Sequence, residues 1–241
     1  MTRPIQANPI NARLIQARSI QAGLDTDEVC RYFYNLNGTD NVIETGQKFL
    51  NDVFSGDFFI EFGIEKVPSL SGAIVSQNVS STKTEMEFQI SKNAGVFEIV
   101  FAGEIVTTTT LVEKAFYRFD FNGSTEIVIS RDGQQVETIS VTAGSASEPI
   151  STFTIGAAHN DDIASYAQFS DGIIYNININ ESAYYAVDDN SSTIKDSVGS
   201  NDAELLNVIA ENWEIICDDK PVDNNRWFDG NQWFDGRKFF D

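Results

Sequence analysis

The sequence predicts an all-β protein, built as a two-sheet antiparallel β-sandwich of the jelly-roll class. From residue 31 onward, the chain consists of short alternating or aromatic-rich runs, which are typical of half-buried strands. Turn residues, above all Asn-Gly and Asp-Gly, separate these runs, and apolar residues at helical spacing are nearly absent. The runs amount to about a dozen regular strands, a number that indicates two packed sheets.

Two segments show the strand pattern most clearly. Residues 116–121 alternate, so that Tyr117, Phe119 and Phe121 point to one face. The tripeptide Arg131-Asp132-Gly133 joins two further runs and predicts a hairpin, because Asp-Gly tolerates the positive φ of a tight turn. The predicted strands cover residues 31–37, 41–45, 57–66, 73–77, 85–90, 96–101, 104–110, 116–121, 126–130, 134–140, 152–156, 172–180, 183–187, 204–208 and 213–217.

Composition excludes several classes of function. The chain has 241 residues, of which 41% are hydrophobic and 12% aromatic, and this is ample for a core that needs no metal or disulfide. Its 16 basic and 36 acidic residues give a net charge of -20, so we expect no nucleic-acid binding. We also expect no membrane insertion, since no apolar run approaches the length of a membrane span. No secretory signal follows Met1, which predicts synthesis in the cytoplasm.

The two cysteines, Cys30 and Cys217, lie near the two ends of the predicted sandwich. A sandwich often pairs its first and last strands, so a disulfide between them is geometrically feasible. Disulfides form poorly in the cytosol, however, and two reduced core thiols are therefore the expected state.

Residues 1–29 form a predicted anchoring arm that contains four pentads between residues 3 and 22. A period of five places successive isoleucines on alternating faces of a strand, so one core cannot bury them all. Pro4 and Pro9 disfavour a helix at the start, although residues 12–22 could form one that ends at Gly23. The arm carries three arginines and no acid up to residue 24, which favours docking on an acidic partner. Its expected anchoring residues are Arg3, Ile5, Ile10, Arg13, Ile15, Arg18 and Ile20.

Residues 219–241 form a polar linker and a predicted aromatic tail with a repeat of six residues. Its aromatic residues could pack on the sandwich as a short hairpin, contact other copies or a partner protein, or form a tip that stacks on sugars. Aromatic bands of this size are rarely left open in a monomer, and repeats that cannot bury their apolar positions alone predict either a homo-oligomer, such as a homotrimer, or a wrapped partner protein. The expected contact residues are Trp227, Phe228, Trp233, Phe234 and Phe239.

Four segments of the predicted sandwich, which spans residues 30–218, resemble a known domain family. The stretch 154–179 is similar to the late strands of concanavalin A-like, laminin G-type sandwiches, with their Thr-Ile-Gly and Phe-x-Gly-x-Ile-x-x-Ile pattern. Residues 34–44 resemble the opening strand and turn, and 127–136 the Asp-Gly hairpin. Residues 184–207, followed by Trp213, resemble the terminal segment of such domains in bacteriophages and prophages. The resemblance covers about residues 31–217.

The resemblance implies a fold that hosts lectins, glycosidases and structural modules, so function depends on the sites. Glycosidases of this architecture carry alternating carboxylates on one strand. Glu61 and Glu65 share a strand face, as do Glu85 and Glu87, but both pairs lack a third carboxylate. Solvent-exposed strand faces explain both pairs, and we therefore predict a protein that is not an enzyme.

Two sets of loop residues are candidates for binding. A sugar would be stacked by aromatic rings and hydrogen-bonded by polar side chains. The candidates for this role are His159, Asn160, Asp161, Tyr166, Tyr184 and Tyr185. Ca²⁺ prefers oxygen ligands, and some laminin G-type domains bind it, although turn chemistry alone explains many loop carboxylates. The candidate Ca²⁺ ligands are Asp188, Asp189, Asn190 and Asp196, and we expect no other cofactor.

Together, arm, sandwich and tail predict a phage or prophage structural protein at the virion surface. In this interpretation the arm contacts another capsid or tail protein, and the lectin-like sandwich serves as a decoration, head-fibre or tail-fibre part. Host-glycan attachment and purely structural decoration both stay open. A polysaccharide-cleaving enzyme and a secreted cellular adhesin are the alternatives from other classes.

Overall fold

The computed structural model describes residues 29–49, 57–77, 88–101, 104–123, 125–141, 151–160, 165–187, 190–218, 226–228 and 233–235. The chain divides into two compact units. One is the continuous segment Tyr32–Ile215, which holds most of the sandwich, and the other combines Met1–Arg31 with Ile216–Asp241. The predicted domain boundaries at residues 29 and 218 stay predictions. Among the described residues, no helix has both the length and the apolar character to cross a membrane.

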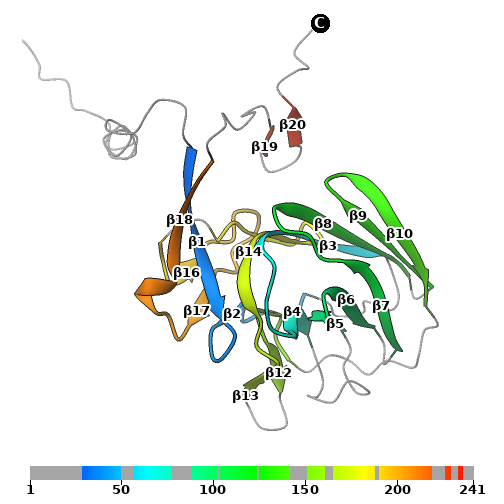
Figure 1. Cartoon of the computed structure of the whole chain (residues 1–241), viewed down its shortest axis with the longest axis horizontal. Coiled ribbons are helices and arrows are strands. Elements are labelled where there is room, and N and C mark those ends of the chain that lie inside the picture. Colours follow the sequence, from blue (N-terminus) through cyan, green and yellow to red (C-terminus); the bar gives the residue numbers. More distant parts are fainter. Residues whose placement is uncertain are drawn as a thin grey trace, which may run out of the picture. The chain divides into compact units, whose positions relative to one another are not determined.

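The first sheet has eight antiparallel strands in the order β10-β9-β8-β3-β14-β1-β18, with β15 pairing along β14 (Figure 1). Its first and last strands in the sequence, β1 and β18, are therefore neighbours. The bounds are β1 Val29–Asn37, β3 Phe58–Lys66, β8 Ala115–Asn122, β9 Glu126–Arg131, β10 Gln134–Ser140, β14 Asp171–Ile179, β15 Ala183–Tyr185 and β18 Trp213–Asp218.

The second sheet also has eight strands, in the order β16-β17-β2-β11-β4-β5-β6-β7. The bounds are β2 Val42–Glu44, β4 Gly72–Gln77, β5 Phe88–Asn93, β6 Val96–Phe101, β7 Glu104–Thr110, β11 Thr154–Ile155, β16 Thr193–Ile194 and β17 Ala203–Leu206. Two small hairpins, β12 (Ala158–Asn160) with β13 (Ser165–Ala167) and β19 (Arg226–Phe228) with β20 (Trp233–Asp235), and one 3₁₀ turn, η2 (Ala210–Asn212), complete the described elements.

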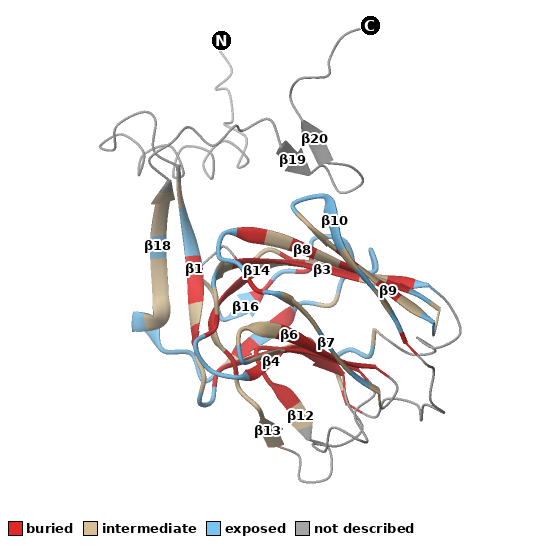
Figure 2. Ribbon diagram, turned by 45° about the vertical axis from the view of Figure 1, so that its right-hand side comes forward, coloured by how far each residue is buried: buried red, intermediate tan, exposed pale blue. Residues whose placement is uncertain are grey.

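The core lies between the two sheets and is rich in phenylalanine (Figure 2). Phe58 of β3 stacks on Phe121 of β8 with ring centroids 4.4 Å apart, and Phe88 of the second sheet meets Phe121 edge-on at 5.4 Å. Tyr117, Phe119 and Phe121 are fully buried, whereas the alternate residues of β8 are only half-buried. The predicted two-sheet sandwich and the predicted alternation in this strand are both confirmed.

The hairpin between β9 and β10 also matches its prediction. Arg131 pairs with Gln134, so the loop consists of Asp132 and Gly133 alone. These two residues have φ values of 51° and 77°, as a two-residue hairpin turn of this kind requires.

The expectation of reduced cysteines is wrong in this structure. Cys30 and Cys217 form a disulfide, with a Cα–Cα distance of 4.0 Å across a sequence separation of 187 residues. The reason is topological, because β1 and β18 lie side by side at one end of the first sheet and bring the two side chains together.

The largest local difference from the sequence prediction lies between residues 156 and 170. This stretch was expected to be a loop, yet it contains the β12–β13 hairpin. Strands of three residues are too short to show an alternating pattern. The predicted strand at 152–156 is correspondingly shorter and covers only Thr154–Ile155.

Candidate functional site

The β12–β13 hairpin brings together two of the residues that the sequence singled out. His159 lies directly opposite Tyr166, and their rings stack with centroids 5.0 Å apart and an interplanar angle of 28°. Directly opposed residues of an antiparallel pair share one face, so both rings belong to the same side of the hairpin. Asn160 pairs with Ser165 in the same hairpin, while Asp161 lies outside the described residues.

A hydrogen bond fixes the position of Tyr166. Its hydroxyl group donates to Oε2 of Glu44 in β2 at 2.8 Å, and Oε1 of the same carboxylate accepts the backbone N–H of Gly46. Burial raises the pKa of Tyr166, and the bond to Glu44 raises the pKa further. The phenol therefore stays protonated and serves as a donor over the whole physiological pH range.

Two described parts of the segment 156–170 are bonded to buried polar side chains of the second sheet, through Ala157 and Gln168, a feature that the sequence did not reveal. The hydroxyl groups of Ser76 and Thr154 lie 2.8 Å apart, and both donate to the carbonyl of Ala157. Nε2 of Gln89 donates to Oε1 of Gln168 at 2.8 Å. Ser76, Gln89 and Thr154 are completely buried, so these bonds hold the segment on the sheet.

Gly72 allows this segment to approach closely. A Cβ atom at this position would lie 2.3 Å from the carbonyl oxygen of Phe169, a contact that no real side chain could make. The backbone N–H of the next residue, Ala73, donates to the carbonyl of Gln168 at 2.7 Å. The sequence around Gly72 does not reveal this requirement, because Phe169 lies far along the chain.

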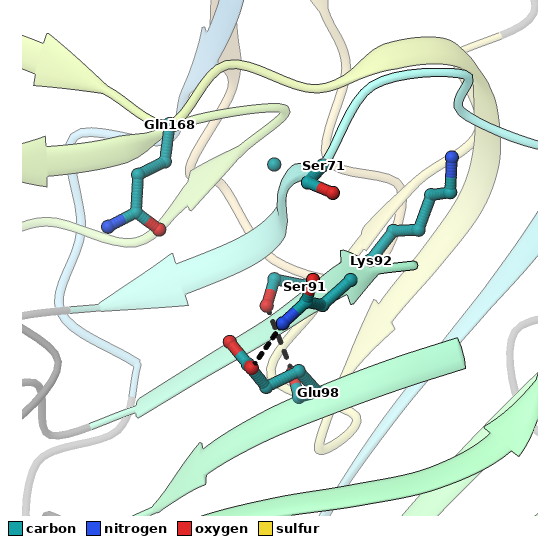
Figure 3. A pocket seen from close by; sticks show the side chains of 7 residues that line it. Ser71, Ser91, Lys92, Glu98 and Gln168 are labelled. Carbon is teal, nitrogen blue, oxygen red and sulfur yellow. Dashed lines mark hydrogen bonds between the residues drawn. The ribbon is translucent and has the colours of Figure 1, made fainter. Parts of the chain in front are cut away.

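A small pocket of about 210 Å³ opens beside Gly72 and Gln168 (Figure 3). The exposed Ser71 lies at its rim, and the buried Ser91 and Glu98 form part of its wall. Glu98 accepts a hydrogen bond from Nδ2 of Asn93 at 2.7 Å, and Ser91 donates to the carbonyl oxygen of Glu98 at 3.1 Å. The lining residues are Ser71, Gly72, Ser91, Lys92, Asn93, Glu98 and Gln168.

The other two tyrosines of the predicted sugar site lie elsewhere. Both belong to β15, which pairs with β14 in the first sheet and not with the β12–β13 hairpin. Tyr184 is half-buried. Tyr185 is fully buried and its hydroxyl donates to the carbonyl of Asn201 at 2.7 Å. Tyr185 is therefore a core residue and cannot stack on a sugar, which corrects the prediction for this position.

Asp196, a predicted Ca²⁺ ligand, is engaged with the protein itself. Its two carboxylate oxygens accept four backbone N–H groups, those of Tyr184, Val198, Gly199 and Asn201. Asn190 is exposed, and Asp188 and Asp189 lie outside the described residues. Within the described part of the chain, no three His, Cys, Asp or Glu side chains are grouped as metal ligands would be. The Ca²⁺ site stays a prediction, whose remaining ligands are residues 188–190.

Glu61 was expected on a solvent-exposed strand face, and this expectation is wrong. The residue is only 8% exposed. Its carboxylate accepts Nη1 of Arg118 at 2.7 Å and Nδ2 of Asn178 at 3.0 Å. Arg118 also contacts Asp120 through Nε and stacks over Phe59, with Cζ 3.8 Å from the ring centroid. The pairing of β3 with β8 creates this ionic network, because it places Glu61 directly opposite Arg118.

The predicted anchoring and oligomer-contact residues are mostly beyond the described parts of the structure. Arg3, Ile5, Ile10, Arg13, Ile15, Arg18, Ile20 and Phe239 lie outside the described residues. In the tail, β19 and β20 pair through their backbones, with Trp227 opposite Phe234 and Phe228 opposite Trp233. Residues 226–228 and 233–235, which belong to the first two repeats, therefore form an antiparallel pair.

Comparisons with known proteins give similarity at the level of structure alone. No protein-family model matches the chain, and no curated protein sequence matches it. The native heptameric SAP-like pentraxin from Limulus polyphemus is similar over 65% of this chain and 77% of its own, with 11% identity and a TM-score of 0.43.

Two further solved structures are similar over less than half of their own length. Domains LG4-5 of the mouse laminin α1 chain match 83% of this chain and 48% of theirs, with 13% identity and a TM-score of 0.40. The binding domain of botulinum neurotoxin serotype D matches 60% of this chain and 39% of its own, with 12% identity and a TM-score of 0.38. Because these sequence identities and TM-scores are low, the assignment of a two-sheet sandwich rests on the strand order of this chain itself.

Proposed function

We propose that this chain is a glycan-binding β-sandwich displayed on the surface of a virion, with residues 1–29 as its anchor. The observation that supports glycan binding is the stacked His159–Tyr166 ring pair of the β12–β13 hairpin, where the polar residues Asn160 and Ser165 form the next pair along the strands. Sugars are recognised by this combination, since an aromatic ring packs against their C–H face and polar groups bind their hydroxyls. Asn160 and Asp161 follow His159 directly and complete the candidate site.

Glycan binding is tested with an array of immobilised oligosaccharides. We expect the full chain to bind, and we expect Tyr166→Ala and His159→Ala to weaken binding at least about tenfold, because each removes a stacking surface. Tyr184→Ala is the matched control, since this half-buried tyrosine belongs to β15 of the first sheet and not to the β12–β13 hairpin. Binding that depends on Tyr184 and not on Tyr166 would place the site at β15. An array without any signal would leave structural decoration as the function.

We further propose binding without cleavage. The ionic network around Glu61 supports this, because Arg118 and Asn178 engage a carboxylate that a glycosidase would need to direct at a substrate. Incubation of the protein with the oligosaccharides that it binds should release no new reducing ends. Release that persists in a Glu61→Gln variant would place a catalytic centre elsewhere in the chain.

The anchor is tested by cross-linking mass spectrometry on purified virions. We expect cross-links between residues 3–22 and another capsid or tail protein, and an oligomer of the full chain in light scattering. The disulfide favours a second candidate, a secreted adhesin, because disulfides persist in oxidising surroundings. Particles that lack this chain, together with its recovery from a cell surface, would support the adhesin and refute the virion role.

A further inference from the structure

Two turns of the sandwich contain an Asn-Gly dipeptide, Asn37-Gly38 and Asn122-Gly123. In such a dipeptide the backbone nitrogen of the glycine can attack the side-chain amide of the asparagine, and no Cβ hinders the attack. Each asparagine is the last residue of a strand, β1 or β8, and the two glycines have φ values of 71° and 57°. The sequence and the backbone therefore make the two dipeptides look alike.

The side chain of Asn37 is held in place by its own turn. Its Oδ1 accepts the backbone N–H groups of Thr39, Asp40 and Asn41 at 2.9, 3.1 and 3.3 Å. Its Nδ2 donates to Oδ1 of Asp40 at 2.6 Å. An amide that rotates toward the Gly38 nitrogen must give up these hydrogen bonds, so the turn raises the barrier to attack at this site.

Asn122 is held much less firmly. Its side chain is exposed, and among the residues that the structure describes it makes one hydrogen bond, from Nδ2 to Oε1 of Glu126 at 2.8 Å. The space around the two glycines differs as well. A Cβ on Gly123 would meet no described atom within 4 Å beyond its chain neighbours, whereas a Cβ on Gly38 would lie 2.6 Å from Cδ1 of Leu70. The attacking and the attacked group therefore have more freedom at Asn122.

We propose that Asn122 is a site of spontaneous deamidation, in which the chain modifies itself with water as the co-reactant. The Gly123 nitrogen bonds to Cγ of Asn122 and the Cγ–Nδ2 bond breaks. The amide leaves as ammonia, with the proton that the Gly123 nitrogen gives up. Water then opens the resulting succinimide ring at either carbonyl group and yields aspartate or isoaspartate. This chemistry is independent of the proposed glycan binding.

The product places a second carboxylate at the turn between β8 and β9. Asn122 lies directly opposite Glu126 in the register of these strands, and the hydrogen bond from Nδ2 to Glu126 is lost with the ammonia. Carboxylates in directly opposite positions destabilise a strand pair. Isoaspartate also lengthens the main chain directly after Phe121, which is fully buried and stacks on Phe58. Deamidation therefore weakens the first sheet at this hairpin.

The experiment follows the full-length protein as it ages in neutral and in mildly alkaline buffer. Tryptic peptide mapping by tandem mass spectrometry measures the conversion of amide to acid at Asn122 and Asn37 in the same sample, relative to freshly prepared protein. A matched sample is aged in guanidinium chloride, where both turns are unfolded. The variant Asn122→Ser removes the reacting amide and serves as the control for the acidic form.

In the folded protein, we expect Asn122 to react at least about tenfold faster than Asn37, because the side chain of Asn37 makes four hydrogen bonds and that of Asn122 one. The two rates should become similar in guanidinium chloride. Both should rise at alkaline pH, since the attacking nitrogen loses its proton. Aged wild-type protein should unfold at a lower urea concentration than fresh protein, and Asn122→Ser should show no such change.

Three results would overturn the proposal. One is an equal or faster reaction at Asn37 in the folded protein. Another is an Asn122 amide that stays intact in the folded protein and reacts in guanidinium chloride, because the hairpin would then protect it. The third is an acidic form that appears equally in Asn122→Ser. An acidic form at Asn122 with an unchanged urea midpoint would refute the effect on the sheet.

Discussion

Asp196 shows how much of a loop one carboxylate can organise. Burial raises the pKa of this residue, but the four backbone N–H groups that it accepts outweigh burial, and its pKa lies below the ordinary aspartate value of 3.8. The pKa of Asp171 is lowered too, since the bonds from Ser69 and Leu70 outweigh its burial. Both carboxylates thus stabilise the folded state in their ionised form.

Asp196→Asn should lower the free energy of unfolding by about 1–3 kcal/mol at pH 7, because the new amide N–H₂ group faces backbone donors. The pKa of Asp196 is lower in the folded state than in the unfolded state. The stabilisation by its ionised carboxylate is therefore complete above about pH 4 and is lost as the pH falls through the folded-state pKa. Urea unfolding at several pH values measures the difference from wild type.

The control for Asp196 is Glu211→Gln, a change at an exposed acidic residue of η2 that should leave stability within about 0.5 kcal/mol. The wild-type and Asp196→Asn curves should converge in acid. A stability difference that stays constant from neutral pH to pH 2 would show that the carboxylate charge is not what holds the loop.

At the scale of elements, strand pairing brings together the Glu61–Arg118 ion pair and the His159–Tyr166 ring pair. Arg118 alternates with the buried aromatic residues of β8, and the register of β3 with β8 gives it Glu61 as its direct partner. Likewise, His159 and Tyr166 were individual candidates until the β12–β13 hairpin placed them opposite each other. A sequence pattern fixes which face a side chain takes, whereas the cross-strand partner depends on the register.

Arg118→Met should destabilise the protein by about 1–3 kcal/mol. It leaves the buried carboxylate of Glu61 without its guanidinium, and the loss is smaller than for a fully buried pair because the Arg118 side chain is 37% exposed. Thermal and urea unfolding measure the effect. Adding Glu61→Gln to Arg118→Met should recover part of the loss, since the unpaired charge is then removed.

A neighbouring ion pair provides the matched control. Lys114 lies 3.7 Å from Glu65 and its side chain is 66% exposed, so Lys114→Met should cost less than about 1 kcal/mol. If Lys114→Met and Arg118→Met had the same free energy of unfolding, the burial of Glu61 would not be the reason why its ion pair stabilises the fold.

At the scale of the whole molecule, the disulfide joins the first and last strands of the first sheet. It closes a loop of 187 residues. In the chain-entropy model, this cross-link lowers the entropy of the unfolded chain and thereby stabilises the folded state by about 5 kcal/mol. Reduction with dithiothreitol should lower the free energy of unfolding by about this amount. The measurement is urea unfolding of the full chain with and without the reductant.

The double variant Cys30→Ser/Cys217→Ser controls for effects of the reductant. It should be as stable as the reduced wild type, and dithiothreitol should not change it further. An oxidised and a reduced protein with the same unfolding midpoint would mean that the strands hold together without the covalent link.

The sequence by itself determined the sandwich, most of its strands and the direction of their side chains. These properties follow from local chemistry: alternation in residues 116–121 and the positive φ of Asp132-Gly133 both act within a few positions. The same local logic identified His159 and Tyr166 as residues of interest, but it also proposed Tyr185, because exposure does not follow from residue type.

Only the tertiary structure decided which distant residues meet. It paired Cys30 with Cys217, placed Glu61 against Arg118, and bonded Tyr185 to Asn201 and Gln89 to Gln168. Each of these contacts joins positions whose separation along the chain carries no periodic signal. They depend on strand order and register, which are set by the packing of the whole core and not by any single segment.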